Sequence, residues 1–290
     1  MCGLKWRTAS GAWRISHALV AFVAWLLAAT FTLAADAVLD VVERGAFEAA
    51  AKAFQDFNYE RAEREFAEFV RVFPESSLRS EATLLQARAR FSRTNAPGAI
   101  DLLTAGLPRA GQLADQYQFW LGEARLEAGQ FAKAAEAYGL LVRDFTNSPH
   151  RFAAAHHEAL ARFRLGEHSN VVALLRAPDG AFQRAANASP TNALAIGGTL
   201  LLGESLLVTR DHVGAEQAAR GLLQRGLTGD AAWRGQYLLG RVLLAANRPA
   251  EALNEATNLV RRAEAPALRA EAFALHGAVL EKLGDLPGAV

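Results

Sequence analysis

Apolar and small residues recur along this chain with a helical period, and again with a longer period close to 37 residues. From residue 43 onward, apolar positions three or four residues apart alternate with charged ones, which indicates amphipathic helices. In each repeat a small residue is followed four positions later by an apolar one, and we call the first of the two the anchor. The pairs are Ala62/Phe66, Ala99/Leu103, Ala134/Tyr138, Val171/Leu175, Ala215/Ala219 and Ala252/Ala256, and Ala289 begins a seventh unit.

Two further positions repeat in register with the anchor. Twelve residues before it the chain always has Gly or Ala: Ala50, Ala87, Gly122, Ala159, Gly203, Gly240 and Gly277. Five residues before it we expect a turn, at Phe57, Thr94, Gly129, Gly166, Arg210, Asn247 and Gly284. A glycine inside a helix costs about 1 kcal/mol relative to alanine. We therefore predict helical hairpins in which the small residue of the first helix lies where the second helix crosses it.

This pattern resembles the tetratricopeptide repeat, a helical hairpin of 34 residues with W, L-G and Y in the first helix and A, F and P in the second. The similar stretches are "FWLGEARLEAGQFAKAAEAY" (119–138), "YLLGRVLLAANRPAEAL" (237–253) and "LHGAVLEKLGDLPGAV" (275–290). The resemblance implies an all-α fold, a right-handed α-solenoid of hairpins. We expect it to cover residues 36–290, with six complete units and a partial seventh.

Two units end in a way that is similar to tetratricopeptide proteins of the bacterial envelope. The first ends "AEREFAEFVRVFPESSLRSEA" (62–82) and the third "AAEAYGLLVRDFTNSPHRFAAA" (134–155). These endings resemble the outer-membrane barrel-assembly lipoprotein and the Tol–Pal coordinator. The only cysteine, Cys2, precedes the apolar run of the N-terminus, so the lipidated cysteine of a lipoprotein has no counterpart here.

The repeat is irregular at one place. The step between the fourth and fifth anchors is 44 residues, and the additional residues fall in "RAPDGAFQRAANASPTN" (176–192). This segment is rich in Pro, Gly, Asn and Ser, which favours a loop. We expect a kink or an extended loop there, within one continuous solenoid.

The first 35 residues differ from the rest. They contain Lys5, Arg7 and Arg14 and no acidic residue, followed by the apolar run 18–35 and small residues suitable for cleavage. This order predicts a secretory signal peptide, and the alternative is an uncleaved membrane anchor. Removing residues 1–35 changes the formal charge from +1 to −2. We therefore expect a periplasmic or secreted protein, membrane-associated only if residues 18–35 are retained, and no nucleic-acid partner.

Motifs that would indicate catalysis are not evident. The stretch "HHEALAR" (156–162) lacks the second histidine of a zinc protease signature. His150 and His157 share a helix face without a third ligand. There is no G-x-S-x-G, no phosphate-binding glycine loop and no Cys–His pair. We predict that the protein is not an enzyme and needs no metal or cofactor.

In proteins with this repeat, the first helices line the concave face. The inner positions 15 residues before each anchor are Phe47, Leu84, Phe119, His156, Leu200 and Tyr237, and charged residues 11 before the anchor are Arg88, Glu123, Glu204 and Arg241. An aromatic stripe with charged edges suits an amphipathic or extended peptide. The alternative is that these aromatics only pack between neighbouring hairpins, which we favour for a further set eight residues before the anchor (Phe54, Phe91, Leu126, Phe163, Leu207 and Leu244).

The sequence thus predicts an exported, non-catalytic scaffold for protein–protein interaction in the bacterial cell envelope. A membrane-anchored assembly factor, or the non-catalytic part of a larger enzyme or secretion machine, are the alternatives. Near the C-terminal end, Phe273, Leu275, Val279 and Leu280 would lack a covering helix. We therefore expect a continuation of the chain or self-association through this end.

Overall fold

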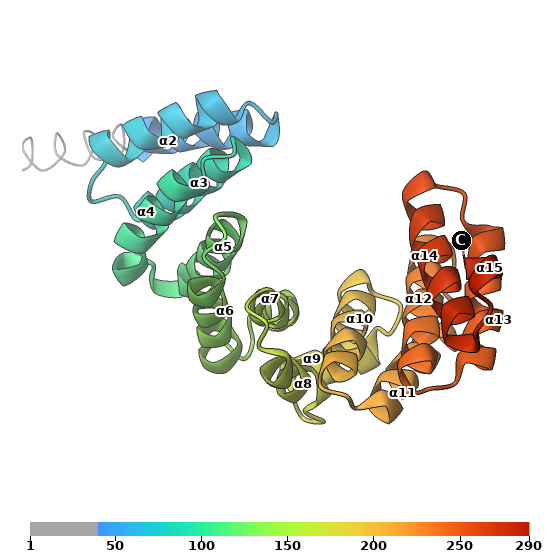
Figure 1. The fold of residues 1–290 in the computed structure, drawn as a ribbon. Helices are drawn as coiled ribbons and strands as arrows, with labels where there is room; N and C mark the ends of the chain where they lie inside the picture. The colour runs from blue at the N-terminus through green and yellow to red at the C-terminus, as the bar shows by residue number, and fades with distance from the viewer. Residues whose placement is uncertain (1–39, 290) are drawn as a thin grey trace, which may run out of the picture. The chain divides into compact units, whose positions relative to one another are not determined.

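The computed structural model describes residues 40–289, apart from the side chains of Leu286 and Ala289. The predicted signal peptide or anchor, residues 1–35, lies outside the described residues. The chain divides into two compact units between Arg93 and Thr94. Residues 40–289 form helices and turns without a strand, which confirms the predicted all-α class (Figure 1). Each unit is described by itself.

The first unit contains a helix over residues 40–55, followed by α2 (Tyr59–Val72) and α3 (Arg79–Ser92). Its core is aromatic, because the ring of Phe47 meets Phe66 and Phe69 edge-to-face at centroid distances of 5.7 and 5.6 Å. An ion-pair cluster links α2 to the end of α3, where Glu63 accepts hydrogen bonds from Arg90 (2.7 Å) and Arg93 (2.6 Å).

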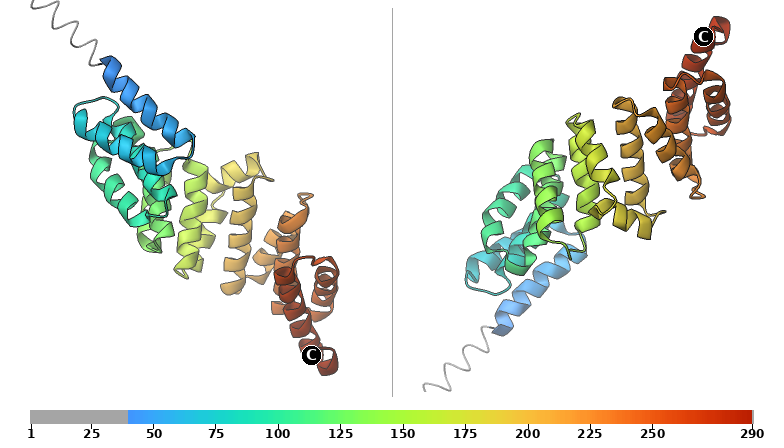
Figure 2. Two further views of the ribbon diagram at one scale, coloured as in Figure 1. Left: turned by 90° about the horizontal axis from the view of Figure 1, so that it is seen from above. Right: turned by 90° about the horizontal axis from the view of Figure 1, so that it is seen from below.

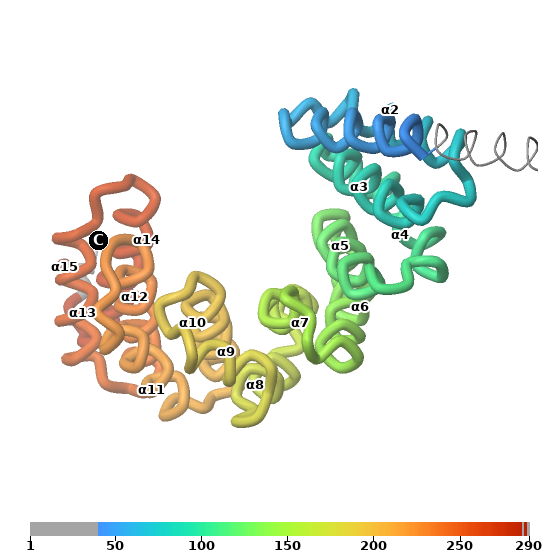
Figure 3. Tube along the Cα trace, turned by 180° about the vertical axis from the view of Figure 1, so that it is seen from behind, coloured from blue at the N-terminus to red at the C-terminus, as the bar shows by residue number. Residues whose placement is uncertain are grey.

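The second unit is a stack of helices joined by short turns (Figures 1 and 3). First helices of successive hairpins contact one another, α5 with α7, α7 with α10, α10 with α12 and α12 with α14. Each also contacts the second helix that follows it, so the chain forms the predicted solenoid of hairpins. The helices are α4 (Ala96–Gly106), α5 (Ala114–Glu127), α6 (Phe131–Asp144), α7 (Arg151–Arg164), α8 (His168–Arg176), α9 (Ala181–Ala188), α10 (Ala193–Val208), α11 (His212–Leu223), α12 (Gly229–Ala245), α13 (Pro249–Arg262), α14 (Pro266–Leu283) and α15 (Leu286–Ala289), with 3₁₀ turns η1 (Leu107–Arg109) and η2 (Gly111–Leu113).

The anchor pairs occupy the centres of the hairpins. All twelve side chains of the six complete pairs, from Ala62/Phe66 to Ala252/Ala256, are 0 or 1% exposed. A small anchor lets the second helix approach its neighbours closely, and the residue one turn later fills the space beside it. The repeat register that was read from the sequence is therefore the register of the core.

The seven predicted turn positions share one backbone conformation. Each has a positive φ between 59° and 83°, including the non-glycine residues Phe57, Thr94, Arg210 and Asn247. The residue that follows donates its backbone N–H to a carbonyl five residues earlier, as from Asp211 to Leu206 (2.8 Å). This is the Schellman ending of a helix, which needs a left-handed residue at this place. The turn positions are thus set by helix termination, and glycine is the least strained choice there.

Close packing explains the glycines in the first helices, with two kinds of neighbour. A Cβ on Gly122 would lie 2.5 Å from Cε1 of Tyr138, in the second helix of the same hairpin, as predicted. A Cβ on Gly203 would instead meet Leu238 at 2.5 Å, and one on Gly240 would meet Leu275 at 2.8 Å. Both leucines belong to the first helix of the next hairpin. For these two units the prediction of a crossing within the hairpin was wrong, because the tight contact lies between hairpins.

The additional residues after the fourth anchor form a helix, not an extended loop. Helix α9 buries Phe182 (2% exposed) and Ala186 (5%). The ring of Phe182 lies against the backbone of α10, where a Cβ on Gly198 would approach its Cζ atom to 2.2 Å. A glycine at this place lets the inserted helix dock, so the expectation of an extended loop over 176–192 is corrected.

The serine of the "FPES" and "FTNS" endings connects successive units. Ser148 donates a hydrogen bond to Asp115 (2.6 Å) and accepts one from the backbone N–H of His150 (3.1 Å). Ser76 makes the same pair of contacts in the first unit, with Glu43 and the N–H of Leu78. The hydroxyl therefore caps the turn and holds it to an acidic residue of the preceding first helix.

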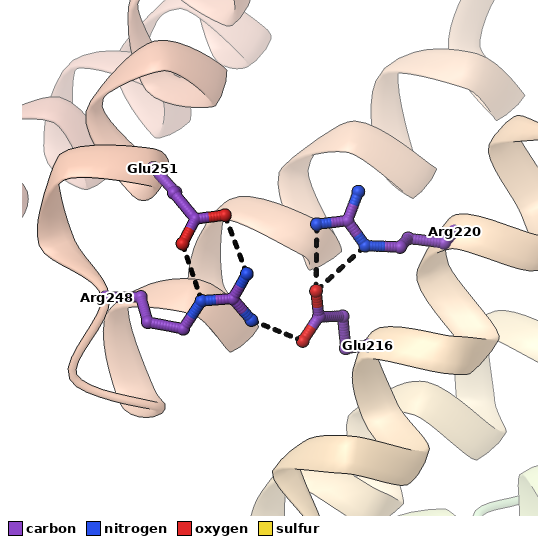
Figure 4. A network of polar contacts seen from close by, with 4 residues as sticks. All are labelled: Glu216, Arg220, Arg248 and Glu251. Atoms are coloured by element: carbon purple, nitrogen blue, oxygen red, sulfur yellow. Dashed lines mark hydrogen bonds and ion pairs between the residues drawn. The ribbon is translucent and has the colours of Figure 1, made fainter.

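The second helices of the last hairpins are joined by charges (Figure 4). Glu216 of α11 binds Arg220 on its own helix (2.8 Å) and Arg248 at the start of α13 (2.6 Å), and Arg248 also binds Glu251 (2.6 Å). Views from above and below show α11 and α13 side by side in the stack (Figure 2). Because these side chains are substantially solvated, the network adds little stability and helps mainly to set the register of neighbouring hairpins.

Candidate partner-binding surface

In the first unit the predicted inner residues are largely engaged within the protein. Phe47 belongs to the aromatic core described above. Leu84 is 2% exposed and offers almost no surface to a partner. The guanidinium of Arg88 lies over the ring of Phe54, 5.1 Å from its centroid. We therefore remove Phe47 and Leu84 from the surface on which a partner would bind.

Phe119 and Glu123 of α5 are part of a polar and aromatic cluster. The carboxylate of Glu123 accepts a hydrogen bond from the hydroxyl of Tyr138 (2.6 Å) and lies 2.7 Å from Nδ1 of His157. Burial opposes its ionisation, but these contacts outweigh burial and hold the pKa of Glu123 below its ordinary value. The ring of Phe119 stacks on His150 at a centroid distance of 4.5 Å. Glu123 thus orders the packing of α5, α6 and α7.

The remaining inner residues come together at a pocket between α7, α10, α12 and α14. His156, Leu200, Glu204 and Tyr237 all line it, and its volume is about 450 Å³. Leu160, Phe163 and Leu201 contribute further apolar surface. The structure therefore brings predicted residues from three first helices to one site, in the size range of ligand pockets, about 300–1,000 Å³.

Glycine and histidine shape the wall of this pocket. A Cβ on Gly197 of α10 would lie 2.9 Å from Nε2 of His156, so the imidazole sits directly on the helix backbone. Burial, with a smaller contribution from neighbouring His157, lowers the pKa of His156 to about 4. His156 is therefore neutral at pH 7, and its Nδ1 atom has no hydrogen-bond partner among the described residues.

Arg241 reaches the pocket through Glu204. Its guanidinium donates hydrogen bonds to both carboxylate oxygens of Glu204, at 2.5 and 2.7 Å, from α12 to α10. It also lies 5.8 Å from the ring centroid of Tyr237. The sequence spacing predicted these charged residues on one face, and the structure pairs them with each other.

The sequence analysis missed the residues that complete the pocket. Trp233, one helical turn before Tyr237, is 6% exposed and stacks on it at 5.2 Å with an angle of 11°. Arg234, Leu268 and Glu271 also line the site, the last two from α14. The i, i+4 spacing of Trp233 and Tyr237 was a usable signal. The inner positions of the seventh unit were not included in the predicted set, which explains the omission of Leu268 and Glu271.

The face of α14 that was expected to be uncovered is partly buried. Leu275 is 5% exposed and Val279 0% exposed, so the expectation for these two was wrong. Leu275 packs on Gly240 of α12, which shows that the preceding hairpin covers it. Phe273 (54%) and Leu283 (44%) are exposed, as predicted for Phe273.

Between residues 40 and 289, no group of three or more His, Cys, Asp and Glu side chains is arranged to hold a metal ion. His150 and His157 instead stack around Phe119. Every helix in the same range is too short or too polar to cross a membrane.

Comparisons with solved structures identify the fold. A tetratricopeptide repeat protein from Parabacteroides merdae matches with a TM-score of 0.59 at 13% identity, covering 85% of this chain and 89% of that one. PilF of Pseudomonas aeruginosa matches with a TM-score of 0.56 at 14% identity, covering 80% and 96%. A chain in the structure of Naa15/Naa10 bound to HypK-THB matches at 0.51 and 13%, covering 85% of this chain and 35% of that chain.

These similarities establish that the chain has the tetratricopeptide repeat fold, which confirms the resemblance seen in the sequence. At such identities they show the fold alone. No protein-family model and no curated protein sequence matches the chain. Proteins built as helical solenoids commonly use their extended concave surfaces to bind other proteins.

Proposed function

We propose that this protein is a non-catalytic scaffold that binds a segment of a partner protein on the first helices of its second unit. The observation that carries the proposal is the pocket between α7, α10, α12 and α14. It combines large apolar side chains with a few polar groups, a composition suited to anchoring side chains of a bound peptide. The tetratricopeptide repeat fold supports this role, as does the protein complex in one of the matched structures, Naa15/Naa10 bound to HypK-THB.

Site-specific photo-crosslinking tests the proposal. A benzophenone amino acid replaces Leu200, which lines the pocket, and in a matched control it replaces Val213, an exposed residue of α11 outside the pocket. We expect one or a few defined protein adducts, found by mass spectrometry, from position 200 and not from position 213 in native cells. Adducts of the same proteins from both positions, or none from position 200, would contradict it.

We further propose that the scaffold works in the bacterial cell envelope after export. The basic and then apolar order of residues 1–35 supports export, and the "FPES" and "FTNS" endings support an envelope role by resemblance. A membrane-anchored assembly factor is the alternative, in which residues 18–35 are retained. The mass of the N-terminal peptide from an envelope fraction distinguishes the two, because cleavage leaves a new N-terminus near residues 34–37 and an anchor leaves residues 18–35 attached.

A further inference from the structure

The charges at the pocket define what kind of segment it accepts. Arg241 neutralises Glu204, as described above. Arg234 is paired with Asp230 at 2.7 Å. Glu271, on α14, lines the pocket and has no ion-pair partner among the described residues. With His156 neutral, the groups around the pocket therefore carry a net charge of −1, contributed by Glu271.

The polar atoms of the wall add a second requirement. Nε1 of Trp233 and Nδ1 of His156 are buried without a hydrogen-bond partner among the described residues. An unpaired buried polar atom is costly, and a polypeptide backbone can supply both acceptors and donors. The rest of the lining is apolar: Leu160, Phe163, Leu200, Leu201 and Leu268, beside the stacked Trp233 and Tyr237.

We propose that the pocket binds a partner segment in which a large apolar side chain lies close to a lysine or arginine, and that Glu271 selects the cation. The inference rests on the function proposed above and specifies its ligand. The apolar side chain enters among Leu200, Leu201 and Tyr237, and the cation lies at the α14 rim next to Glu271. A partial stack of an arginine on an exposed aromatic edge is compatible with the same arrangement.

Selection from a random-peptide phage library on the intact protein tests the ligand chemistry. The enriched peptides are synthesised, and their dissociation constants are measured by fluorescence polarisation at low and high salt. We expect the enriched sequences to pair a large apolar residue with a nearby lysine or arginine. Glu271→Gln should weaken binding about three- to fivefold, the range an exposed ion pair provides, and less at high salt. Glu271→Lys should weaken it further.

Glu281→Gln and Glu281→Lys are matched controls, because Glu281 lies on the same helix, is exposed and does not line the pocket. They should leave binding unchanged. A Leu200→Gln variant, with its fold checked by circular dichroism, reports on the pocket itself.

Peptides that lose affinity with Leu200→Gln but respond equally to the Glu271 and Glu281 changes would overturn the inference and leave the proposed function standing. Enriched sequences with an acidic residue in place of the cation would do the same. Peptides indifferent to Leu200→Gln, or no enriched peptide at all, would count against both.

Discussion

Replacing Gly122 by alanine is the most direct test of the close packing in this fold. The new Cβ would lie 2.5, 2.7 and 2.8 Å from three ring atoms of Tyr138, whereas ordinary contact begins at 3.4 Å. Tyr138 is 0% exposed and its hydroxyl binds Glu123 at 2.6 Å. The ring must therefore retreat by about 1 Å within a close-packed core, and the retreat strains or breaks that hydrogen bond.

The magnitude follows from opposing contributions. Alanine gains about 1 kcal/mol of helix propensity over glycine. Overpacking costs about 1–3 kcal/mol, and weakening a hydrogen bond to a carboxylate costs about 1.5–3 kcal/mol if the bond is lost. The unfavourable effects are larger, so we expect Gly122→Ala to destabilise the second unit by about 1–3 kcal/mol.

Urea unfolding monitored by circular dichroism measures the change, and hydrogen exchange shows whether the loss of protection is centred on α5 and α6. The matched controls are Gly45→Ala and Gly221→Ala, where an added Cβ meets nothing within 4 Å. These should stabilise the protein by up to about 1 kcal/mol. In a Tyr138→Ala background the Gly122→Ala change should also become stabilising. If Gly122→Ala stabilises the native protein as the controls do, the steric argument is wrong.

Three other changes test separate features. Arg210→Gly should raise stability in urea by about 0.5–1 kcal/mol, because Arg210 has a φ of 65° and a left-handed conformation is unfavourable for a residue with a Cβ; an unchanged midpoint would contradict this. Gly198→Ala should displace Phe182 and raise hydrogen exchange throughout α9, with Gly221→Ala as the control that leaves it unchanged. Hydrogen bonds from Arg90 and its neighbour in α3 hold the pKa of Glu63 below its ordinary value of 4.5 although burial opposes them. The stability that Glu63 contributes is thus present above the unfolded pKa and lost as pH falls through the lower folded pKa. Glu63→Gln should reduce stability at pH 7, and the deficit should shrink below about pH 4.5; a deficit independent of pH would refute the assignment.

The repeat could be read from the sequence because its determinants are local. Anchor residues such as Ala62 and Ala134 occupy the same helical position in every unit, and helix termination requires a left-handed residue five places before them. These constraints act within one hairpin, so they leave a periodic trace along the chain. The helix content, the turn positions and the buried anchors were therefore predictable without any knowledge of tertiary contacts.

The partners of individual side chains were decided only by the tertiary structure. Gly122 and Gly240 occupy equivalent positions, yet the first receives Tyr138 of its own hairpin and the second receives Leu275 of the next. The residue equivalent to Tyr138 is alanine in the later unit, so the space is filled from another helix. A sequence period reports that a position is small, but it carries no information on which neighbour fills the gap.

The candidate site shows the same division. Sequence spacing placed His156, Leu200, Glu204 and Tyr237 on inner helix faces, and the structure brings them to one pocket. The pairing of Glu204 with Arg241, the neutral imidazole and the unpaired carboxylate of Glu271 depend on burial and on distances between helices about 35 residues apart in the chain. The local pattern of the sequence determined which residues face inward, and the packing of hairpin on hairpin decided which of them remain available to a partner.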